Sequence, residues 1–350
     1  MDCTNPPASV PSDPGVAGIG VLLSFIITAG ISLLISASLV FQELRTSRTK
    51  SPLRPSILRR KLLNSYSDQQ ILTGIGIQSV GLAKRDSLIP YHFFIVWMLS
   101  LLSMAVHNAT LLALARDFRR DWVLRWMREL MMLVNLVLSC IYGVFILRAV
   151  QRGISDATFP IECAWRPETQ NGPPASNAAV SYIGTGVVIL GNVVIFVLAV
   201  WYLHARARRF YPVVQSVGVI LMAAFAVGAT VRVAYLADAF SHKTPIPLSD
   251  DGERVWSFGQ LLSVGMLLLP LATVVEILRG EIKCAPPEPE IEDEGKSRLL
   301  SEEEPAQGEA EAEAEAETET PMQELRSDGP APERPEFQPS PVSSYLHKKH

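Results

Sequence analysis

Residues 181–203 read SYIGTGVVILGNVVIFVLAVWYL and contain no acidic or basic side chain in 23 consecutive positions. A helix of roughly 20 residues is long enough to cross a hydrocarbon core about 30 Å thick. Lipid offers no hydrogen-bond partner to backbone N–H and C=O groups, and a helix satisfies these groups internally. This stretch therefore predicts a transmembrane helix.

Six further apolar stretches predict the same structure. They are Val16–Phe41, Tyr66–Ala83, Ile89–Ala115, Met127–Leu147, Val213–Leu236 and Val255–Leu278. The predicted fold class is an all-α membrane protein with seven transmembrane helices within residues 16–280, between an extracytoplasmic segment, residues 1–15, and a cytosolic tail, residues 281–350. In the second stretch, Ser67 is expected to cap a short glycine-rich helix, Ile71–Ala83. In the last stretch, Pro270 is the sign of a broken helix.

The basic residues predict which loops face the cytosol. The first loop contains seven Lys and Arg residues between Arg45 and Lys61, the third contains a cluster at 116–128, and the fifth contains three arginines at 206–209. Loops 151–177 and 237–254 hold more acids than bases. Short cytosolic loops collect Lys and Arg. The N-terminus is therefore predicted to lie outside and the C-terminus in the cytosol.

The charge of the chain is divided between two unlike parts. Residues 281–350 contain 19 acidic against 7 basic residues, a net charge of −12, and the remainder contains 16 against 24, a net charge of +8. Low hydrophobicity with high charge cannot offset the entropy cost of ordering, so the acidic tail is predicted to be disordered. Anionic lipid headgroups explain the basic part, and nucleic acid is not an expected partner. The expected partners are the lipid bilayer and cytosolic proteins that contact the basic loops and the tail.

The cysteines fall in three settings. Cys3 and Cys163 both lie on the predicted outer, oxidising side, where they either form a disulfide or remain independent thiols. Cys140 lies within an apolar stretch and is interpreted as a packing residue. Cys284 follows the last helix, where it is either a palmitoylation site or an unmodified thiol.

Polar side chains within the spans are costly and mark candidate functional positions. His107 and Asn108 lie well inside the third span, Asn135 lies in the fourth and Asn192 in the fifth. These four residues could line a polar cavity that contacts a ligand or ion. The alternative is that each bridges neighbouring helices through hydrogen bonds.

Catalytic signatures are missing from the sequence. It contains neither Gly-x-Ser-x-Gly nor His-Glu-x-x-His, and the spans hold no pair of carboxylates. No catalytic residue, cofactor or metal site is predicted. The leading interpretation is a receptor-like or scaffolding protein of the plasma membrane or an endomembrane, including the vacuolar membrane. The alternatives are a transporter or channel with a polar path along helices three to five, and an intramembrane enzyme.

Three segments carry a resemblance to a known family. They are CTNP at 3–6 with DPGVAGIGV at 13–21, SDQQILTG at 67–74, and YHFFIVW at 91–97 leading to HNATL at 107–111. In these segments the chain resembles a family of uncharacterised integral membrane proteins of filamentous ascomycete fungi. Family members join Asn-Pro directly to Asp, whereas Pro7–Ser12 intervenes here. The resemblance covers about residues 3–280 and implies a fungal source and a seven-helix fold, with no implied substrate.

Overall fold

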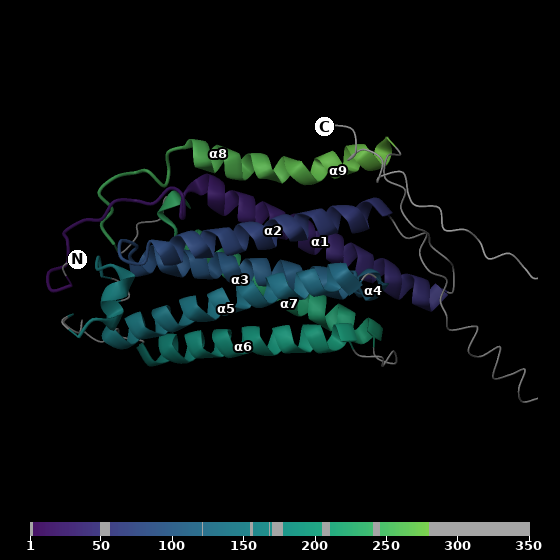
Figure 1. Ribbon diagram of the computed structural model, residues 1–350, viewed down its shortest axis with the longest axis horizontal. Coiled ribbons are helices and arrows are strands. Elements are labelled where there is room, and N and C mark those ends of the chain that lie inside the picture. Colours follow the sequence, from purple (N-terminus) through teal and green to yellow (C-terminus); the bar gives the residue numbers. More distant parts are fainter. Residues whose placement is uncertain are drawn as a thin grey trace, which may run out of the picture. The chain divides into compact units, whose positions relative to one another are not determined.

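The computed structural model describes residues 3–49, 57–120, 122–154, 157–167, 169, 178–204, 211–240 and 246–279, all within one unit, Met1–Pro287. These parts of the chain are helical and contain no β-strand (Figure 1). The α-helices are α1 (Ile19–Thr49), α2 (Ile57–Ala83), α3 (Pro90–Ala113), α4 (Ala115–Arg120), α5 (Trp122–Arg152), α6 (Ala178–His204), α7 (Tyr211–Leu236), α8 (Phe258–Gly265) and α9 (Leu269–Leu278). Short 3₁₀ helices are η1 (Ile161–Trp165), η2 (Asp238–Phe240) and η3 (Met266–Leu268).

Six helical segments within the described ranges are long and apolar enough to cross a membrane. They are Ile19–Arg45, Pro90–Ala113, Arg125–Arg152, Tyr182–His204, Val213–Leu236 and Phe258–Ile277. Six of the seven predicted spans therefore correspond to span-capable helices. The second predicted span, Tyr66–Ala83, lies in α2, which is less apolar than the others and is not among them.

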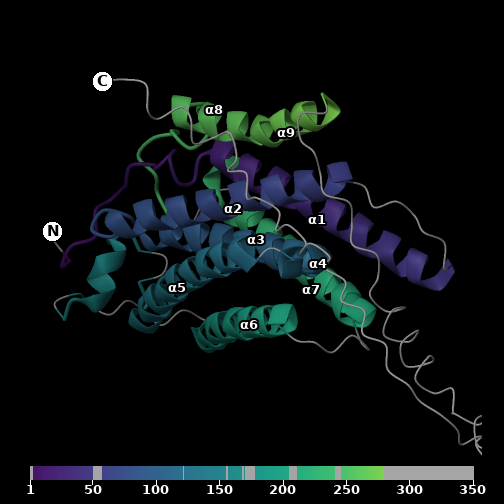
Figure 2. The same cartoon turned by 45° about the vertical axis from the view of Figure 1, so that its right-hand side comes forward.

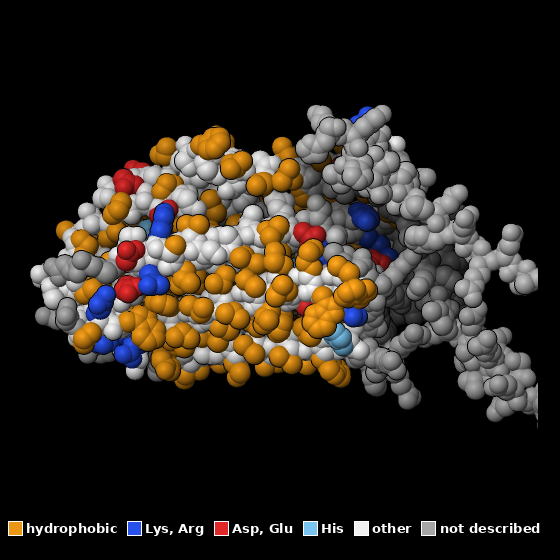
Figure 3. All heavy atoms as spheres, viewed as in Figure 1, with side chains coloured by type: hydrophobic (Ala, Val, Ile, Leu, Met, Phe, Trp, Pro, Cys, Tyr) orange, Lys and Arg blue, Asp and Glu red, His pale blue; other side chains and the backbone are white. Residues whose placement is uncertain are grey.

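The helix α3 forms the centre of the bundle. Its most apolar window is 94 % buried, whereas the corresponding window of α6 is only 17 % buried. Around α3 lie α1, α2, α5, α6 and α7, and α8 with α9 lies outside α1 and α2 (Figures 1 and 2). Figure 3 shows an apolar band on the bundle surface between two ends that carry charged side chains. An exposed apolar band of this kind suits a lipid environment.

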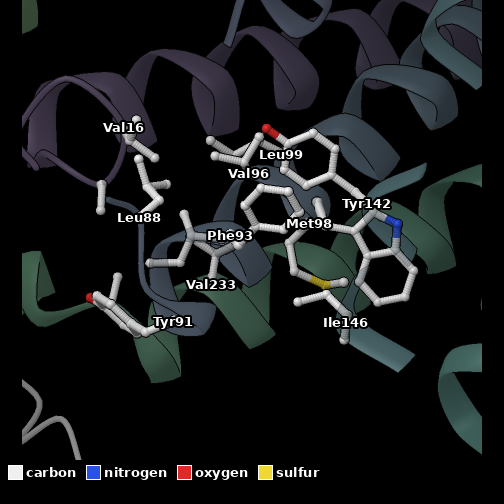
Figure 4. Close-up of a cluster of buried hydrophobic side chains, with 14 of the residues drawn as sticks. Val16, Leu88, Tyr91, Phe93, Val96, Met98, Leu99, Tyr142, Ile146 and Val233 are labelled. Atoms are coloured by element: carbon white, nitrogen blue, oxygen red, sulfur yellow. The ribbon is translucent and has the colours of Figure 1, made fainter. Parts of the chain in front are cut away.

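Aromatic residues of α3 and α5 fill the core between these helices (Figure 4). The ring of Phe93 stacks on that of Tyr142 with 4.0 Å between the centroids. The hydroxyl of Tyr142 donates to the carbonyl oxygen of Gln78 in α2 at 2.7 Å. A Cβ at Gly81 would collide with that hydroxyl, so α2 can approach α5 closely only because this position is glycine.

Two local expectations have different outcomes. The break at Pro270 is present, because α8 gives way to η3 and α9 begins at Leu269. Proline lacks the N–H that would bond to Met266, so the preceding turn tightens. The capping role expected for Ser67 is wrong. Ser67 lies in the middle of α2, which begins ten residues earlier at Ile57, and it is fully buried.

Candidate functional site

The described residues of the N-terminal segment and of the loops that lead into α3, α6 and α8 form a layer at one end of the bundle, which we call the cap. Cys3 and Cys163 form a disulfide with an S–S distance of 2.03 Å. Val10 and Leu248 form an isolated parallel β-bridge, and the hydroxyl of Thr158 donates to the carbonyl oxygen of Pro7 at 2.7 Å. Residues 3–10 are therefore attached to two distant loops.

Two ion pairs attach the turn between α2 and α3 to the other parts of the cap. The ammonium of Lys84 donates to a carboxylate oxygen of Asp13 at 2.8 Å. The neighbouring Arg85 donates from Nε to Glu162 at 2.6 Å. Both cations are about half-exposed, so these pairs position loops more than they stabilise the fold.

A buried polar cluster lies where the cap meets α3. The carboxylate of Glu253, in the loop before α8, is fully buried and has a partner for each oxygen. His92 Nε2 lies 2.6 Å from Oε1, and the Tyr91 hydroxyl donates to Oε2 at 3.0 Å. His92 is only 2 % exposed. We call Tyr91, His92, Asp238, Glu253 and Arg254 the cap cluster.

Backbone groups and a second ion pair complete the cap cluster. The N–H of Asp238, which follows α7, donates to the Tyr91 hydroxyl at 2.8 Å. Arg254 donates to the Asp238 carboxylate at 2.8 Å and to its carbonyl oxygen at 3.0 Å. The N–H of Ile19 donates to the Glu253 carbonyl oxygen at 3.0 Å. The cluster thus links the starts of α1 and α3 to the chain after α7.

The contacts of the cap cluster hold two parts of the chain together and leave Glu253 no free oxygen for a ligand. Each carboxylate oxygen of Glu253 is engaged by a side chain of α3, so the cluster offers no free ligand atom on this residue. No group of three His, Cys, Asp or Glu side chains in the described ranges could hold a metal ion. Removing one member of a buried hydrogen-bonded pair is destabilising, because it leaves the other buried without a partner. The arrangement therefore fixes the loop before α8 to the central helix.

A second set of polar side chains crosses the bundle. Asn135 of α5 accepts from Gln78 Nε2 at 2.6 Å and donates to the carbonyl oxygen of Ser100 in α3 at 3.5 Å. The hydroxyl of Ser100 lies 3.0 Å from that of Ser139, to which Asn192 of α6 donates at 3.5 Å. We call these five residues the midline chain. It brings together Asn135 and Asn192, two of the four residues proposed from sequence to line a cavity.

The other two predicted cavity residues lie apart from the midline chain. His107 Nδ1 lies 2.9 Å from the hydroxyl of Ser67 in α2, and His107 Nε2 is buried with no hydrogen-bond partner among the described residues. Asn108 is 2 % exposed, and its Oδ1 likewise has no partner in the described part of the chain. His107 and Asn108 are adjacent on α3, so they point in directions about 100° apart. The four residues therefore do not form one cluster.

The end opposite the cap, which we call the inner end, is joined by ion pairs in which at least one side chain is partly exposed. Arg60 of α2 donates to Asp117 at 2.8 Å. Arg128 of α5 pairs with Asp68, and its guanidinium lies 4.5 Å from the centroid of the Phe118 ring. Arg128 itself is only 5 % exposed, whereas its partner Asp68 is 45 % exposed. Cys284 and the acidic tail lie outside the described residues.

Sequence reasoning missed the cap cluster. In the sequence, Glu253 is one of several acids in loop 237–254, and His92 lies near the start of the apolar stretch Ile89–Ala115. The available signal was Tyr91-His92 directly after Pro90, because polar side chains at the start of a buried helix need partners. No protein-family model, curated protein or solved structure matches this chain. Function is therefore inferred from the contacts of its own residues.

Proposed function

We propose that this chain is a receptor-like multi-pass membrane protein in which the cap is the sensing part. The observation that carries this proposal is Glu253, a cap residue that is fully buried between Tyr91 and His92 of the central helix. A change in the cap that moves Glu253 must either move the first turn of α3 with it or break the contacts of Glu253 with Tyr91 and His92. Because α3 contacts six other helices, α4 at the inner end among them, that displacement would reach the inner end.

The proposed topology has seven spans, with the cap outside and the opposite end in the cytosol. The disulfide supports an extracytoplasmic cap, since disulfides persist in oxidising compartments. In this topology α2 also crosses the membrane, in addition to the six span-capable helices. Its polar residues have partners within the bundle, as Ser67 has in His107 and Gln78 in Asn135, and this offsets the cost of placing them in lipid.

The output of the receptor is assigned to the cytosolic side. The basic loops and the acidic tail, residues 281–350, would bind cytosolic proteins through complementary charge. The protein would reside in the plasma membrane or an endomembrane, the vacuolar membrane included.

A transport function has weaker support. A path for a polar solute needs polar groups in sequence along the bundle axis. In the midline chain, Ser100, Ser139 and Asn192 each lie near the middle of their helices and link α3, α5 and α6 side by side. This arrangement favours bridging between helices, at about 0.6 kcal/mol for each hydrogen bond.

The test compares partner recovery from native membranes for three forms of the chain. The full-length chain, a version that ends at Cys284 and the variant Glu253→Gln are crosslinked, purified in mild detergent and examined by mass spectrometry. We expect cytosolic proteins that the full-length chain retains, the truncated version loses and Glu253→Gln recovers in altered amounts. Identical recovery with Glu253→Gln would contradict the coupling between cap and inner end. Recovery of all three forms without partners would contradict the receptor-like function.

A further inference from the structure

The central helix has one incompletely covered stripe. All 24 residues of α3 are buried except Phe94 and Leu101, which are partly buried. Seven residues correspond to almost two helical turns, so these side chains leave α3 on the same face, and Asn108 follows after seven more. We call the surface along Phe94, Leu101 and Asn108 the α3 stripe.

The helices α6 and α7 border this stripe on its two sides. On one side, Phe94 meets Trp97 edge-on with ring centroids 6.0 Å apart. Trp97 in turn lies next to α6: atoms of Trp97 and of Ile189 in α6 both lie within 3.3 Å of the point that a Cβ atom would occupy at Gly143 in α5. On the other side, the guanidinium carbon of Arg232 in α7 lies 5.8 Å from the centroid of Phe94. In the part of the chain that the structure describes, α6 and α7 each contact α3 but make no extensive contact with each other.

We call the space along the α3 stripe between α6 and α7 the seam. The seam closes toward the inner end, where side chains of α3, α6 and α7 share one buried cluster. The cluster includes Leu112, Tyr202, Leu203 and Val219. Asn108 lies one turn before Leu112 and presents a carbonyl oxygen without a donor. The seam is therefore apolar at Phe94 and Leu101 and ends at a polar group.

Arg232 supplies positive charge at the other end of the seam. It is exposed and lies within the span Val213–Leu236, four residues before its end. Among the described residues, its only recorded partner is the Phe94 ring, and no carboxylate pairs with it. A cation within a span costs free energy unless an anion or water approaches it. Phosphate oxygens bind a guanidinium through short, charge-assisted hydrogen bonds.

We propose that this seam binds one phospholipid from the leaflet at the cap end. The phosphate binds Arg232, and one acyl chain lies over Phe94 and Leu101. With a rise of about 1.5 Å per residue, Leu101 lies about 10 Å and Asn108 about 21 Å along the helix from Phe94. One leaflet accounts for about half of a ~30 Å core, so the chain passes Leu101 and ends before the polar Asn108.

The test is native mass spectrometry of the full chain in mild detergent with added palmitoyl-oleoyl phosphatidylglycerol. We expect one retained lipid, and a loss of roughly tenfold or more in its retention with Arg232→Gln, the scale of one hydrogen bond to a charged group. The matched control is Arg148→Gln, because Arg148 of α5 also lies over an aromatic ring, that of Trp165 at 5.6 Å, but away from the seam. This control should retain the lipid as the unchanged protein does.

A second variant separates loss of the site from loss of the fold. Leu101→Trp fills the seam while Arg232 keeps its charge, and it should also abolish retention with an unchanged unfolding temperature. The same two acyl chains on a diacylglycerol, which has no phosphate, should not be retained. Equal losses from Arg232→Gln and Arg148→Gln, equal retention of the diacylglycerol, or no retained lipid at all would each overturn the proposal.

Discussion

The two ends of the bundle are held by different kinds of contact. At the cap end, a disulfide and the buried pair of His92 and Glu253, which are 2 % and 0 % exposed, fix the loops to α3. At the inner end, Arg60 and Asp117 form a pair that is 27 % and 43 % exposed. Exposed pairs contribute little, whereas breaking a buried pair costs several kcal/mol. Breaking the pair of Arg60 and Asp117 should therefore cost less free energy than breaking the pair of His92 and Glu253. The receptor-like function proposed above requires such a difference, because its inner end must rearrange more readily than its cap end.

The largest expected effect comes from breaking the cap cluster. Glu253→Ala leaves the Tyr91 hydroxyl and His92 Nε2 buried without their acceptor, so we expect a loss of about 3–5 kcal/mol in the free energy of unfolding. The measurement is thermal unfolding of the purified protein in detergent. Glu253→Gln keeps an acceptor and should lose less.

The matched control for this prediction is Asp117→Asn at the inner end. It removes one member of a partly exposed pair, and we expect a change within about 1 kcal/mol. Equal losses from Glu253→Ala and Asp117→Asn would show that the two ends do not differ as the contacts indicate.

The second prediction concerns the disulfide. Replacing both Cys3 and Cys163 by Ser should lower the free energy of unfolding by about 2–4 kcal/mol, because the bond restricts the unfolded chain. Cys140→Ser removes a thiol outside the disulfide and serves as the control. The single variant Cys163→Ser leaves the thiol of Cys3, in the N-terminal segment, without its disulfide partner. We expect an impermeant thiol reagent to label Cys3 on intact cells, and labelling only after the membrane is opened would contradict an outside cap.

The sequence predicted that the helices exist better than it predicted where they begin and end. Long apolar runs predict helices because only a helix satisfies a backbone in lipid, and six of the seven runs coincide with span-capable helices. The second helix was harder to predict, since Asn64, Asp68 and Gln70 interrupt its apolar character. Its extension back to Ile57 depends on partners on other helices, such as Asp117 for Arg60. Local sequence does not contain that information.

The candidate site was predictable only in part, for a related reason. His107, Asn108, Asn135 and Asn192 could be recognised one by one, because polar side chains in apolar runs are unusual. Which of them meet depends on the faces that α3, α5 and α6 turn toward each other. Glu253 lies in a polar loop, and its burial arises from contacts with residues more than 160 positions earlier in the chain.

The third prediction tests the middle of the bundle, between the two ends. Asn135→Leu removes the bonds of the midline chain to Gln78 and Ser100. Hydrogen bonds between membrane helices contribute about 0.6 kcal/mol on average and up to about 1.7, so the loss should fall well below that of Glu253→Ala. Thermal unfolding again provides the measurement. Asn192→Leu, which changes the last residue of the midline chain, should lower the free energy of unfolding less than Asn135→Leu does. A loss as large as that of Glu253→Ala would place the main anchor of α3 at the midline.

The smallest expected effect concerns Asp250, an exposed carboxylate of the cap. Comparing it with the buried Glu253 shows whether burial, or only location in the cap, makes a side chain important for stability. The hydroxyl of Ser12 and the N–H of Gly252 donate to Asp250, and these bonds hold the pKa of Asp250 below its ordinary value. A lowered folded-state pKa gives stability that is present above the unfolded-state pKa, about 3.9, and is lost as the pH falls through the folded-state value. The unfolding temperature of the unchanged protein should therefore exceed that of Asp250→Asn slightly at pH 6, and the two should converge under acid conditions. The matched control is Asp251→Asn, which removes the charge of the neighbouring side chain, itself 80 % exposed, and leaves the hydrogen bonds to Asp250 in place. If Asp250→Asn were as destabilising as Glu253→Ala, location in the cap rather than burial would explain the difference between the ends. Because water competes for an exposed carboxylate far more than for a buried one, we expect the Glu253 effect to be much the larger.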